Sequence, residues 1–553
     1  MVDFTLFRLR DDQAELRHLV DLERDGLRSV GPINLPDFTA WLYVLEAPRR
    51  RPPWVQFIES HVPGAIGWRA SQSVSALLLV RTGSEVDPAY FGLAFGQAGR
   101  HILRNEAYVR RFGLITALNL IVDPEAAPRL RAFDTTRHGP NILRSRIQAT
   151  AASGLEVFEL DLLRDLIQRA TGEPADVEQW GRRVGGSDAL RLAADIPFDQ
   201  IGEFCGAVDD VAASDAYRER FGWIDNIRPV TNADLIDKLE AQVLELLRAR
   251  RTDLVQLAPP EVVDWDRLVR FQYHFDTGSR PLLSRQDISS DSYLGGLKAE
   301  DLNSVTARQL RGRKIVGLDA NDDRIEEWPV WRCLVAEFTM ADRTYILEDG
   351  AFYEVASSYL DQLNEDIGVF DRQQPILPPS RTTLTEPDYN QLAADSSSDL
   401  VLMDTQMVPF EGAPNGVELC DILTADKQLI HVKRYGGSST LSHLYLQART
   451  ASELLITSTD FRRDAQVEIN GAANDGRFNF FEEDRIEPRQ FEIVLGIIKQ
   501  WRAKGIESLP FFAKINLRHT LVDLSSLGYA VSVLRIPFEP AGEDAPGGEE
   551  RQP

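Results

Sequence analysis

The 553-residue sequence has few cysteines, no long apolar run and a shortage of basic residues. Its three cysteines (Cys205, Cys333 and Cys420) lie far apart and form no CxxC pair. This spacing argues against a disulfide framework or a zinc ribbon, and it predicts a reducing, cytoplasmic location. No apolar run approaches eighteen residues and no basic-then-apolar leader follows Met1. We therefore expect neither a membrane span nor a signal peptide.

The charge balance is strongly acidic. The 61 Lys and Arg residues are outnumbered by 85 Asp and Glu residues, which gives a formal charge of −24. Such a chain repels phosphate unless its basic residues cluster. Residues 397–536 carry only −3 and the tail from Pro537 carries −4, which leaves −17 for the first 396 residues. The acidic N-terminal two-thirds therefore predict a protein partner, whereas the near-neutral C-terminal part leaves room for a local basic groove.

Length and composition predict a multidomain globular protein of α/β class, since 553 residues exceed what one core holds. Four prolines among small polar residues at 372–388 are typical of an extended linker, and the Pro/Gly/Glu-rich end is typical of disorder. The predicted parts are an α+β domain at 1–155, a helical then β-rich region at 156–371, the linker at 372–388, an α/β domain at 389–536 and a disordered acidic tail at 537–553.

Local patterns predict several elements outside the C-terminal domain. DFTLFRLR near the start and SVSALLLVRTGSEVDPAYFGLAFG from Ser73 alternate as strands do. Residues 156–258 look mainly helical, with Asn232 capping a long helix at 233–251. Residues 330–355 predict antiparallel strands with turns at 340–342 and at Asp349-Gly350. The glycines at 92–113 match neither phosphate-binding fingerprint, so turns and close packing explain them.

The stretch from Gly416 to Ile456 concentrates the polar chemistry of the chain. A hairpin turn centred on Asp426 places Asp421 opposite His431, and directly opposed side chains lie about 5 Å apart. Lys433 would share their face, while Cys420, Ile422, Ile430 and Val432 form a core face on the other side. A register shift of one residue would separate the cluster.

A helix should follow Gly436-Gly437, with Ser438 or Ser439 as its N-cap. Ser439, His443 and Gln447 recur at every fourth position and face the polar edge of the hairpin. The positive end of the helix attracts anions, so Arg434, Ser438, Ser439 and His443 are candidate phosphate ligands.

A strand Asp, a hairpin partner ending in x-x-Lys and a helix with an inward Gln resemble the core of the PD-(D/E)XK nucleases. The resemblance covers roughly residues 388–536 and implies a three-layer α/β domain that acts on DNA or RNA. It implies that Asp421 binds Mg²⁺ or Mn²⁺, that Lys433 is catalytic and that Gln447 is the helical glutamine. That family places an acid two residues before the lysine, where this chain has His431, a poor ligand for Mg²⁺.

The candidate metal ligands are accordingly Asp421, His431 and Glu418, although strand alternation points Glu418 to the opposite face. Two other interpretations stay open. One is a non-catalytic module in which Lys433, Arg434 and the helix N-terminus bind phosphate. The other is a protein-interaction factor whose hairpin holds only a salt bridge and a hydrogen-bonded histidine.

Several segments are also similar to a sporadically distributed bacterial family of about this length whose function is unassigned. They include FGLAFGQAGRHIL near Phe91, FGWIDNI at Phe221, ILEDGAFYEV at Ile346 and HVKRYGGSSTLSHL at His431. The patchy occurrence of that family resembles the distribution of mobile or phage-defence genes, which implies a nucleic-acid target.

Overall fold

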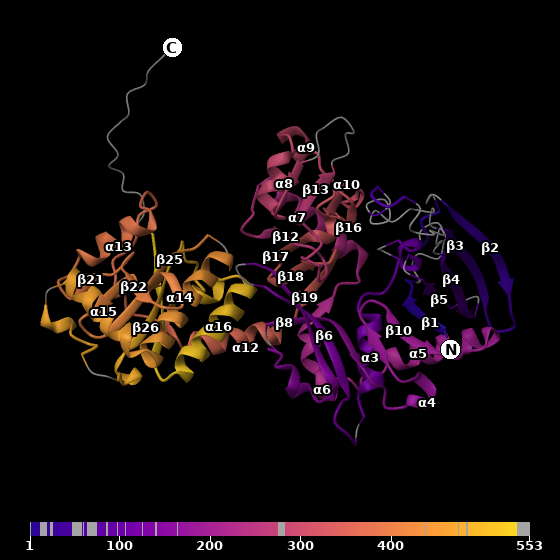
Figure 1. The fold of residues 1–553 in the computed structure, drawn as a ribbon, viewed down its shortest axis with the longest axis horizontal. Coiled ribbons are helices and arrows are strands. Elements are labelled where there is room, and N and C mark those ends of the chain that lie inside the picture. The colour runs from indigo at the N-terminus through magenta and orange to yellow at the C-terminus, as the bar shows by residue number, and fades with distance from the viewer. Residues whose placement is uncertain are drawn as a thin grey trace, which may run out of the picture. The chain divides into compact units, whose positions relative to one another are not determined.

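The computed structural model of this protein mixes helices and strands in several sheets, which confirms the predicted α/β class (Figure 1). It describes residues 2–10, 19–22, 26–46, 58, 60–63, 74–84, 87–96, 98–104, 107–123, 125–138, 141–162, 164–274, 283–436, 438–473, 475–482 and 485–538. Among these residues, every helix is too short or too polar to cross a bilayer. The chain divides into two compact units, one of residues 1–136 and 144–229 and the other of residues 137–143 and 230–553.

The first unit is built on a ten-stranded sheet of order β2-β3-β4-β5-β1-β10-β9-β8-β6-β7. The predicted strands near the N-terminus are confirmed as β1, β4 and β5. The strands are β1 (Val2–Arg8), β2 (Leu27–Asn34), β3 (Thr39–Glu46), β4 (Val74–Gly83), β5 (Pro88–Phe95), β6 (Leu130–Arg137), β7 (Leu143–Ser153), β8 (Asp165–Gly172), β9 (Val184–Gly186), β10 (Leu190–Ala194) and the short β11 (Ile227–Pro229). The helices are α3 (Phe112–Ile121), α4 (Val177–Trp180), α5 (Ile201–Ala212) and α6 (Arg218–Phe221).

Helix α3 lies against one face of this sheet at a glycine contact. A Cβ atom on Gly186 of β9 would overlap the backbone of Gly113 in α3, so only glycine permits this approach. Around the contact, Leu118, Leu190 and Leu192 belong to one buried cluster. The opposite face of the sheet is covered by a second buried cluster only over β1, β3, β4 and β5.

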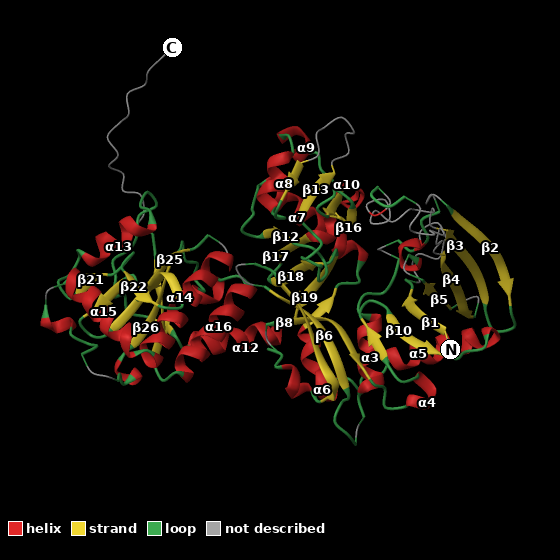
Figure 2. Ribbon diagram, viewed as in Figure 1, coloured by secondary structure: helices red, strands yellow, loops and turns green. Residues whose placement is uncertain are grey.

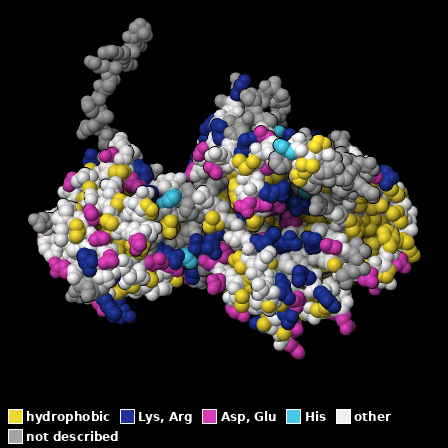
Figure 3. Space-filling model, in the orientation of Figure 1, with side chains coloured by type: hydrophobic (Ala, Val, Ile, Leu, Met, Phe, Trp, Pro, Cys, Tyr) yellow, Lys and Arg dark blue, Asp and Glu magenta, His cyan; other side chains and the backbone are white. Residues whose placement is uncertain are grey.

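The rest of that opposite face carries arginines in place of apolar residues. Arg191 on β10 is exposed and Arg169 on β8 is half-buried. Figure 3 shows Lys and Arg side chains gathered in a dark blue band over the region where Figure 1 labels β6, β8 and β10.

The predicted helical character of residues 156–194 is wrong. This segment forms the strands β8, β9 and β10 with only the short helix α4 between them. The apolar run in DLIQRATG fits a helix and a strand equally well, and pairing of Ala170 with Gly186 in the neighbouring strand decides for the strand.

The second unit contains the remaining elements. They are α7 (Ala233–Arg248), β12 (Val255–Leu257), β13 (Arg270–His274), β14 (Leu283–Arg285), α8 (Ser290–Gly296), α9 (Ala299–Asn303), α10 (Ala307–Gly312), β15 (Lys314–Leu318), β16 (Arg324–Pro329), α11 (Val330–Cys333), β17 (Leu334–Met340), β18 (Arg343–Glu348), β19 (Ala351–Val355), α12 (Ser357–Gly368), β20 (Asp371–Arg372), α13 (Glu386–Ala394), β21 (Leu400–Leu402), β22 (Met407–Phe410), β23 (Ala413–Glu418), β24 (Ile422–Thr424), β25 (Gln428–Arg434), α14 (Ser438–Thr457), α15 (Thr459–Ala472), β26 (Glu492–Ile498), α16 (Phe511–Ser526) and β27 (Ala530–Ile536).

Two local predictions in this unit are confirmed. The Asn232 side chain accepts a hydrogen bond from Leu235 N at 2.9 Å and caps α7. Strands β17, β18 and β19 pair antiparallel, and the first turn places Ala341 and Asp342 at φ of 48° and 62°. Two positive φ values in a two-residue turn match the right-handed twist of the strands.

The C-terminal part of this unit forms a six-stranded sheet of order β20-β27-β26-β25-β24-β21 with helices around it (Figure 2). Strands β25, β26 and β27 are parallel, whereas β24 and β21 join antiparallel. Tyr389 and Ala393 of α13 pack with Ile430 and Val432 on one face of this sheet. The sequence pattern of residues 509–536 predicts a strand, a helix and a strand, but α16 starts at Phe511 and only β27 follows it.

The Pro-rich segment 372–388 packs on this α/β domain. Ser380 is fully buried and bridges to Phe538, and Tyr389 Oη donates a hydrogen bond to Pro378 O at 2.7 Å. Helix α13 already begins within the segment, at Glu386. Beyond Phe538, the predicted disordered tail lies outside the described residues.

Candidate functional site

The register of the β24–β25 hairpin is the predicted one. Leu423 pairs with Leu429 and Ile422 with Ile430, which places Asp421 across from His431. Asp421 N donates to Ile430 O at 3.0 Å and closes the pair.

Two strand breaks before this hairpin create the site. The apolar pattern of DLVLMDTQMVPF at residues 399–410 predicts one strand, but the chain turns between β21 and β22, where Thr405 has a φ of 65°. Residues 416–424 break in the same way between β23 and β24. Strands β22 and β23 therefore pair with each other as a separate hairpin whose base holds Asp404 and Glu418. Met403 N and Asp404 N donate to Asp421 O at 2.8 and 3.0 Å and tie this base to the main sheet.

Three carboxylates meet at this point. One oxygen each of Asp404, Glu418 and Asp421 lie within 4.8 Å of one another. Glu418 had been expected on the opposite face by strand alternation, and that expectation is wrong because the strand ends at Glu418. We call Asp404, Glu418 and Asp421 the carboxylate group. Asp404 was missed from the sequence because the turn after β21 carries no glycine or proline to mark it.

Burial and mutual repulsion make it unfavourable for all three members of the carboxylate group to be ionised at once. The pKa of Asp421 is raised well above its ordinary value by burial and by Glu418, although its hydrogen bond from Val432 N, at 2.7 Å, opposes the rise. Burial also raises the pKa of Glu418, with a further contribution from Asp404 and an opposing one from Lys433. A cation or protons would relieve this repulsion.

Lys433 and Gln447, two further residues predicted from the sequence, lie near the carboxylate group. Lys433 Nζ forms an ion pair with Glu386 at 2.6 Å, at the start of α13. Gln447 of α14 donates from Nε2 to Glu418 Oε2 at 3.1 Å, as a residue that orients this carboxylate would. Sequence reasoning missed Glu386, which also accepts from Arg434 N at 2.8 Å.

His431 does not join the carboxylate group. Its side chain is 1% exposed, and burial lowers its pKa to about 4. Its Nε2 has no hydrogen-bond partner among the described residues, so the expectation of a hydrogen-bonded histidine is not met at that atom. A neutral imidazole in the core is therefore the form that the fold favours.

Asn390 of α13 adds an amide to the site. Its Nδ2 donates to Asp404 Oδ2 at 3.0 Å and to Asp421 Oδ1 at 3.3 Å. Its Oδ1 is buried and, within the described part of the chain, has no partner. Rotation of the amide by half a turn would present this oxygen to a cation among the three carboxylates. Oxygen donors of this kind suit Mg²⁺ and Mn²⁺.

The two candidate phosphate ligands whose side chains are described, Arg434 and His443, form no hydrogen bond or ion pair with the carboxylate group. The guanidinium of Arg434 donates to the backbone carbonyls of Arg381 and Leu384 and lies over the Phe538 ring, so it holds the Pro-rich segment in place. His443 is exposed on α14. Ser438 and Ser439 are in the first turn of this helix, and their side chains lie outside the described residues.

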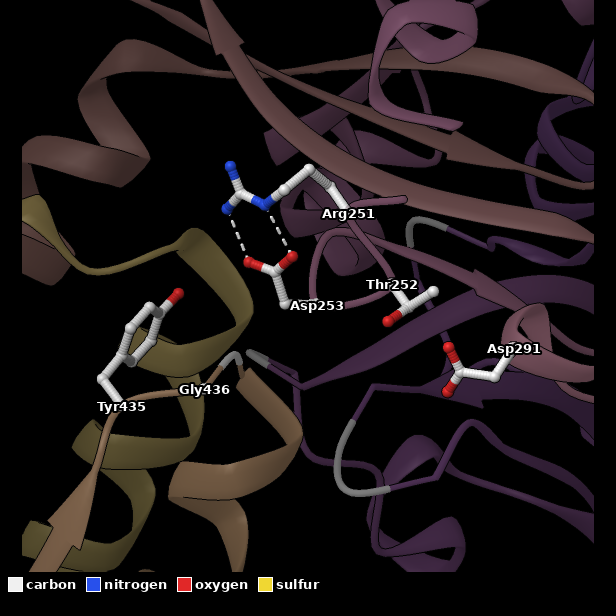
Figure 4. A pocket seen from close by; sticks show the side chains of 6 residues that line it. All are labelled: Arg251, Thr252, Asp253, Asp291, Tyr435 and Gly436. Carbon is white, nitrogen blue, oxygen red and sulfur yellow. Dashed lines mark hydrogen bonds and ion pairs between the residues drawn. The ribbon is translucent and has the colours of Figure 1, made fainter. Parts of the chain in front are cut away.

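An open polar cavity of about 560 Å³ lies beside the start of α14. Figure 4 shows that its one arginine, Arg251, faces Asp253, with hydrogen bonds of 2.8 and 2.6 Å between them. Asp291 adds a second carboxylate to the lining. Among the described residues that line the cavity, no cation is left unpaired to attract phosphate.

A family model matches residues 4–537, nearly the whole described chain. The chain belongs to the family of unknown function DUF6119. This membership confirms the expected kinship with a family whose function is unassigned. For this DUF6119 chain, neither the curated proteins nor the solved structures contain a match. The likeness to the PD-(D/E)XK core therefore stays a prediction.

Proposed function

We propose that the C-terminal α/β domain is a divalent-cation-dependent nuclease. One observation carries the proposal: Asp421 just before β24, Lys433 of β25 and Gln447 of the following helix converge with Asp404 and Glu418. In this proposal Glu418 supplies the second acid that the nuclease pattern places at His431.

The donor set fits Mg²⁺ or Mn²⁺. The carboxylate group would hold the cation, and Asn390 would add its unpartnered Oδ1. A bound cation supplies Lewis acidity toward a phosphoryl oxygen and lowers the pKa of a bound water. Gln447 would orient Glu418, and the ammonium of Lys433 would stabilise negative charge that develops on the phosphate.

A cleavage screen tests this function. Purified protein is incubated with DNA or RNA and with Mg²⁺, Mn²⁺ or EDTA. We expect cation-dependent cleavage that Asp421→Asn and Lys433→Met abolish, while Lys427→Met leaves it intact. Lys427 is the matched control because it lies in the same hairpin and bonds to Gln490 instead. Absence of cleavage of both nucleic acids under every condition would refute the nuclease.

The buried, neutral state of His431 favours a second candidate, a non-catalytic module that binds phosphate through Lys433. Nucleic-acid binding would then survive Asp421→Asn and weaken with Lys433→Met. It would also fall steeply as salt increases, because phosphate contacts release counterions. Binding with that pattern and no cleavage would select this candidate over the nuclease.

A further inference from the structure

A group of arginines lies on the uncovered half of the ten-stranded sheet in the first unit. Arg191 on β10 pairs in register with Gly185 on β9, and Gly185 pairs with Thr171 on β8. Arg169 lies two residues before Thr171 on the same strand and therefore on the same face. Arg146 on β7 and Arg100 in the segment after β5 are close enough for their charges to act on Arg169, and the four arginines form what we call the arginine face.

Gly185 makes room for Arg169. A Cβ atom at Gly185 would lie 3.4 Å from Arg169 Nη2 and 3.0 Å from Thr171 Oγ1. The guanidinium of Arg169 therefore extends over the bare backbone of β9, toward the strand that carries Arg191. Side chains larger than glycine would occupy this space.

Arg169 is the unusual member of the group because it is partly buried and has no hydrogen-bond or ion-pair partner among the described residues, whereas the exposed Arg100 donates to His101. Arg146 donates to both oxygens of Asp134 at 2.7 Å, and Arg191 donates to Asp3 at 3.0 Å. Arg169 makes no hydrogen bond or ion pair with any residue that the structure describes, although it is only partly exposed. Leaving a half-buried cation unpaired costs free energy that an external anion would recover.

The electrostatic surroundings agree with this geometry. Burial lowers the pKa of Arg169, and Arg146, Arg191 and Arg100 lower it further, while Asp134 alone opposes them. Four arginines thus face two carboxylates, Asp3 and Asp134. The face is locally positive in a chain whose net charge is −24.

We propose that the arginine face binds the sugar–phosphate backbone of a nucleic acid, with Arg169 as its central contact. Four strand spacings of about 4.8 Å separate β10 from β7, so the face spans about 19 Å. Successive phosphates of one strand of B-DNA rise about 3.4 Å, so this width faces about six of them. A single phosphate group is too small to reach Arg191 and Arg146 together.

The lining of the face favours nucleic acid over an acidic protein. Between the arginines, the outward positions are Gly185 and Thr171, which offer no apolar anchor. Protein interfaces rely on buried aromatic or aliphatic anchors, whereas backbone contacts to nucleic acid need only charged and hydroxyl donors. Binding through phosphates alone would be independent of base sequence. It is also independent of the carboxylate group in the second unit.

Fluorescence anisotropy with the full chain tests the proposal. The probe is a labelled single-stranded oligodeoxynucleotide of about 20 nucleotides, titrated in EDTA from about 50 to 300 mM salt. We expect Arg169→Gln and Arg191→Gln each to weaken binding about tenfold, the loss of one charged hydrogen bond. Each change should reduce the salt slope by about 0.7. Arg220→Gln, an exposed arginine on α6, is the matched control and should bind as the native chain does.

The result that would overturn the proposal is equal affinity for both variants and the control. Competition by polyglutamate at equal charge would also overturn it and assign the face to an acidic protein. Displacement of the probe by millimolar inorganic phosphate would assign it to a small anion. Because Arg191 is exposed on its strand, Arg191→Gln still tests the face if Arg169→Gln fails to fold. Binding that Arg169→Gln weakens and Lys433→Met leaves unchanged would support the arginine face, whatever the separate cleavage screen with Mg²⁺ or Mn²⁺ shows about the nuclease.

Discussion

Asp404→Asn removes one negative charge from the carboxylate group and keeps the size of the side chain. In the native chain, Asn390 Nδ2 donates a hydrogen bond to Asp404 Oδ2 at 3.0 Å. The amide oxygen of the variant can still accept this hydrogen bond. At 4.8 Å and an effective dielectric constant of about 20, two ionised carboxylates repel by about 3.5 kcal/mol. Asp404 forms two such pairs, with Glu418 and with Asp421.

The net relief is smaller than this sum because the raised pKa values of Glu418 and Asp421 allow partial protonation. We expect Asp404→Asn to raise the local free energy of unfolding by about 1–3 kcal/mol in EDTA. A bound cation should reverse this difference, so that the native chain becomes more stable than Asp404→Asn. At a hundredfold excess over the dissociation constant, a cation stabilises the native chain by about 2.7 kcal/mol, and the variant should gain much less.

Hydrogen exchange of the β24 and β25 amides measures this local stability with and without Mn²⁺. Asp426→Asn is the matched control, because Asp426 is exposed in the hairpin turn. This substitution removes the same charge at a position outside the carboxylate group. Cation protection that is equal in the native chain and in Asp404→Asn would refute the proposed cation site. A loss of stability for Asp404→Asn in EDTA would refute the argument that the three carboxylates repel one another.

Three further changes test separate parts of the structure. His431 has a pKa of about 4, below its ordinary 6.5, so its contribution is present above pH 6.5 and is lost as pH falls to 4. His431→Leu should remove about 3 kcal/mol of that acid-induced loss of stability, measured by urea unfolding across this range; an unchanged pH profile would contradict the assignment. Lys433→Ala should cost about 1 kcal/mol, because both side chains of its pair with Glu386 are partly exposed, without changing cation protection of the β25 amides. Ala341→Gly should raise the thermal stability by about 0.5 kcal/mol, since glycine adopts its φ of 48° without strain, and a lower melting temperature would argue against this turn.

Local sequence was sufficient for features that depend on near neighbours. The β24–β25 register follows from a short turn at Asp426 and alternating side chains, so the opposition of Asp421 and His431 was predictable. The helix that carries Gln447 follows from its apolar stripe, in which Leu441 and Leu444 are fully buried. The N-cap at Asn232 was predictable because its side chain bonds to Leu235 N, only three residues along the chain.

Tertiary structure alone decided which carboxylates meet. The chain leaves the main sheet after β21 and returns before β24 because β22 and β23 pair with each other, and no local pattern marks either break. The separate β22–β23 hairpin brings Asp404 and Glu418 to Asp421, while α13, which precedes these strands in the chain, adds Asn390 and Glu386. The strand at β8 likewise depends on partners that are distant in sequence. Sequence patterns report the side-chain period of one segment, whereas a site made of several segments depends on which strands pair, and that choice is made by the packing of the whole domain.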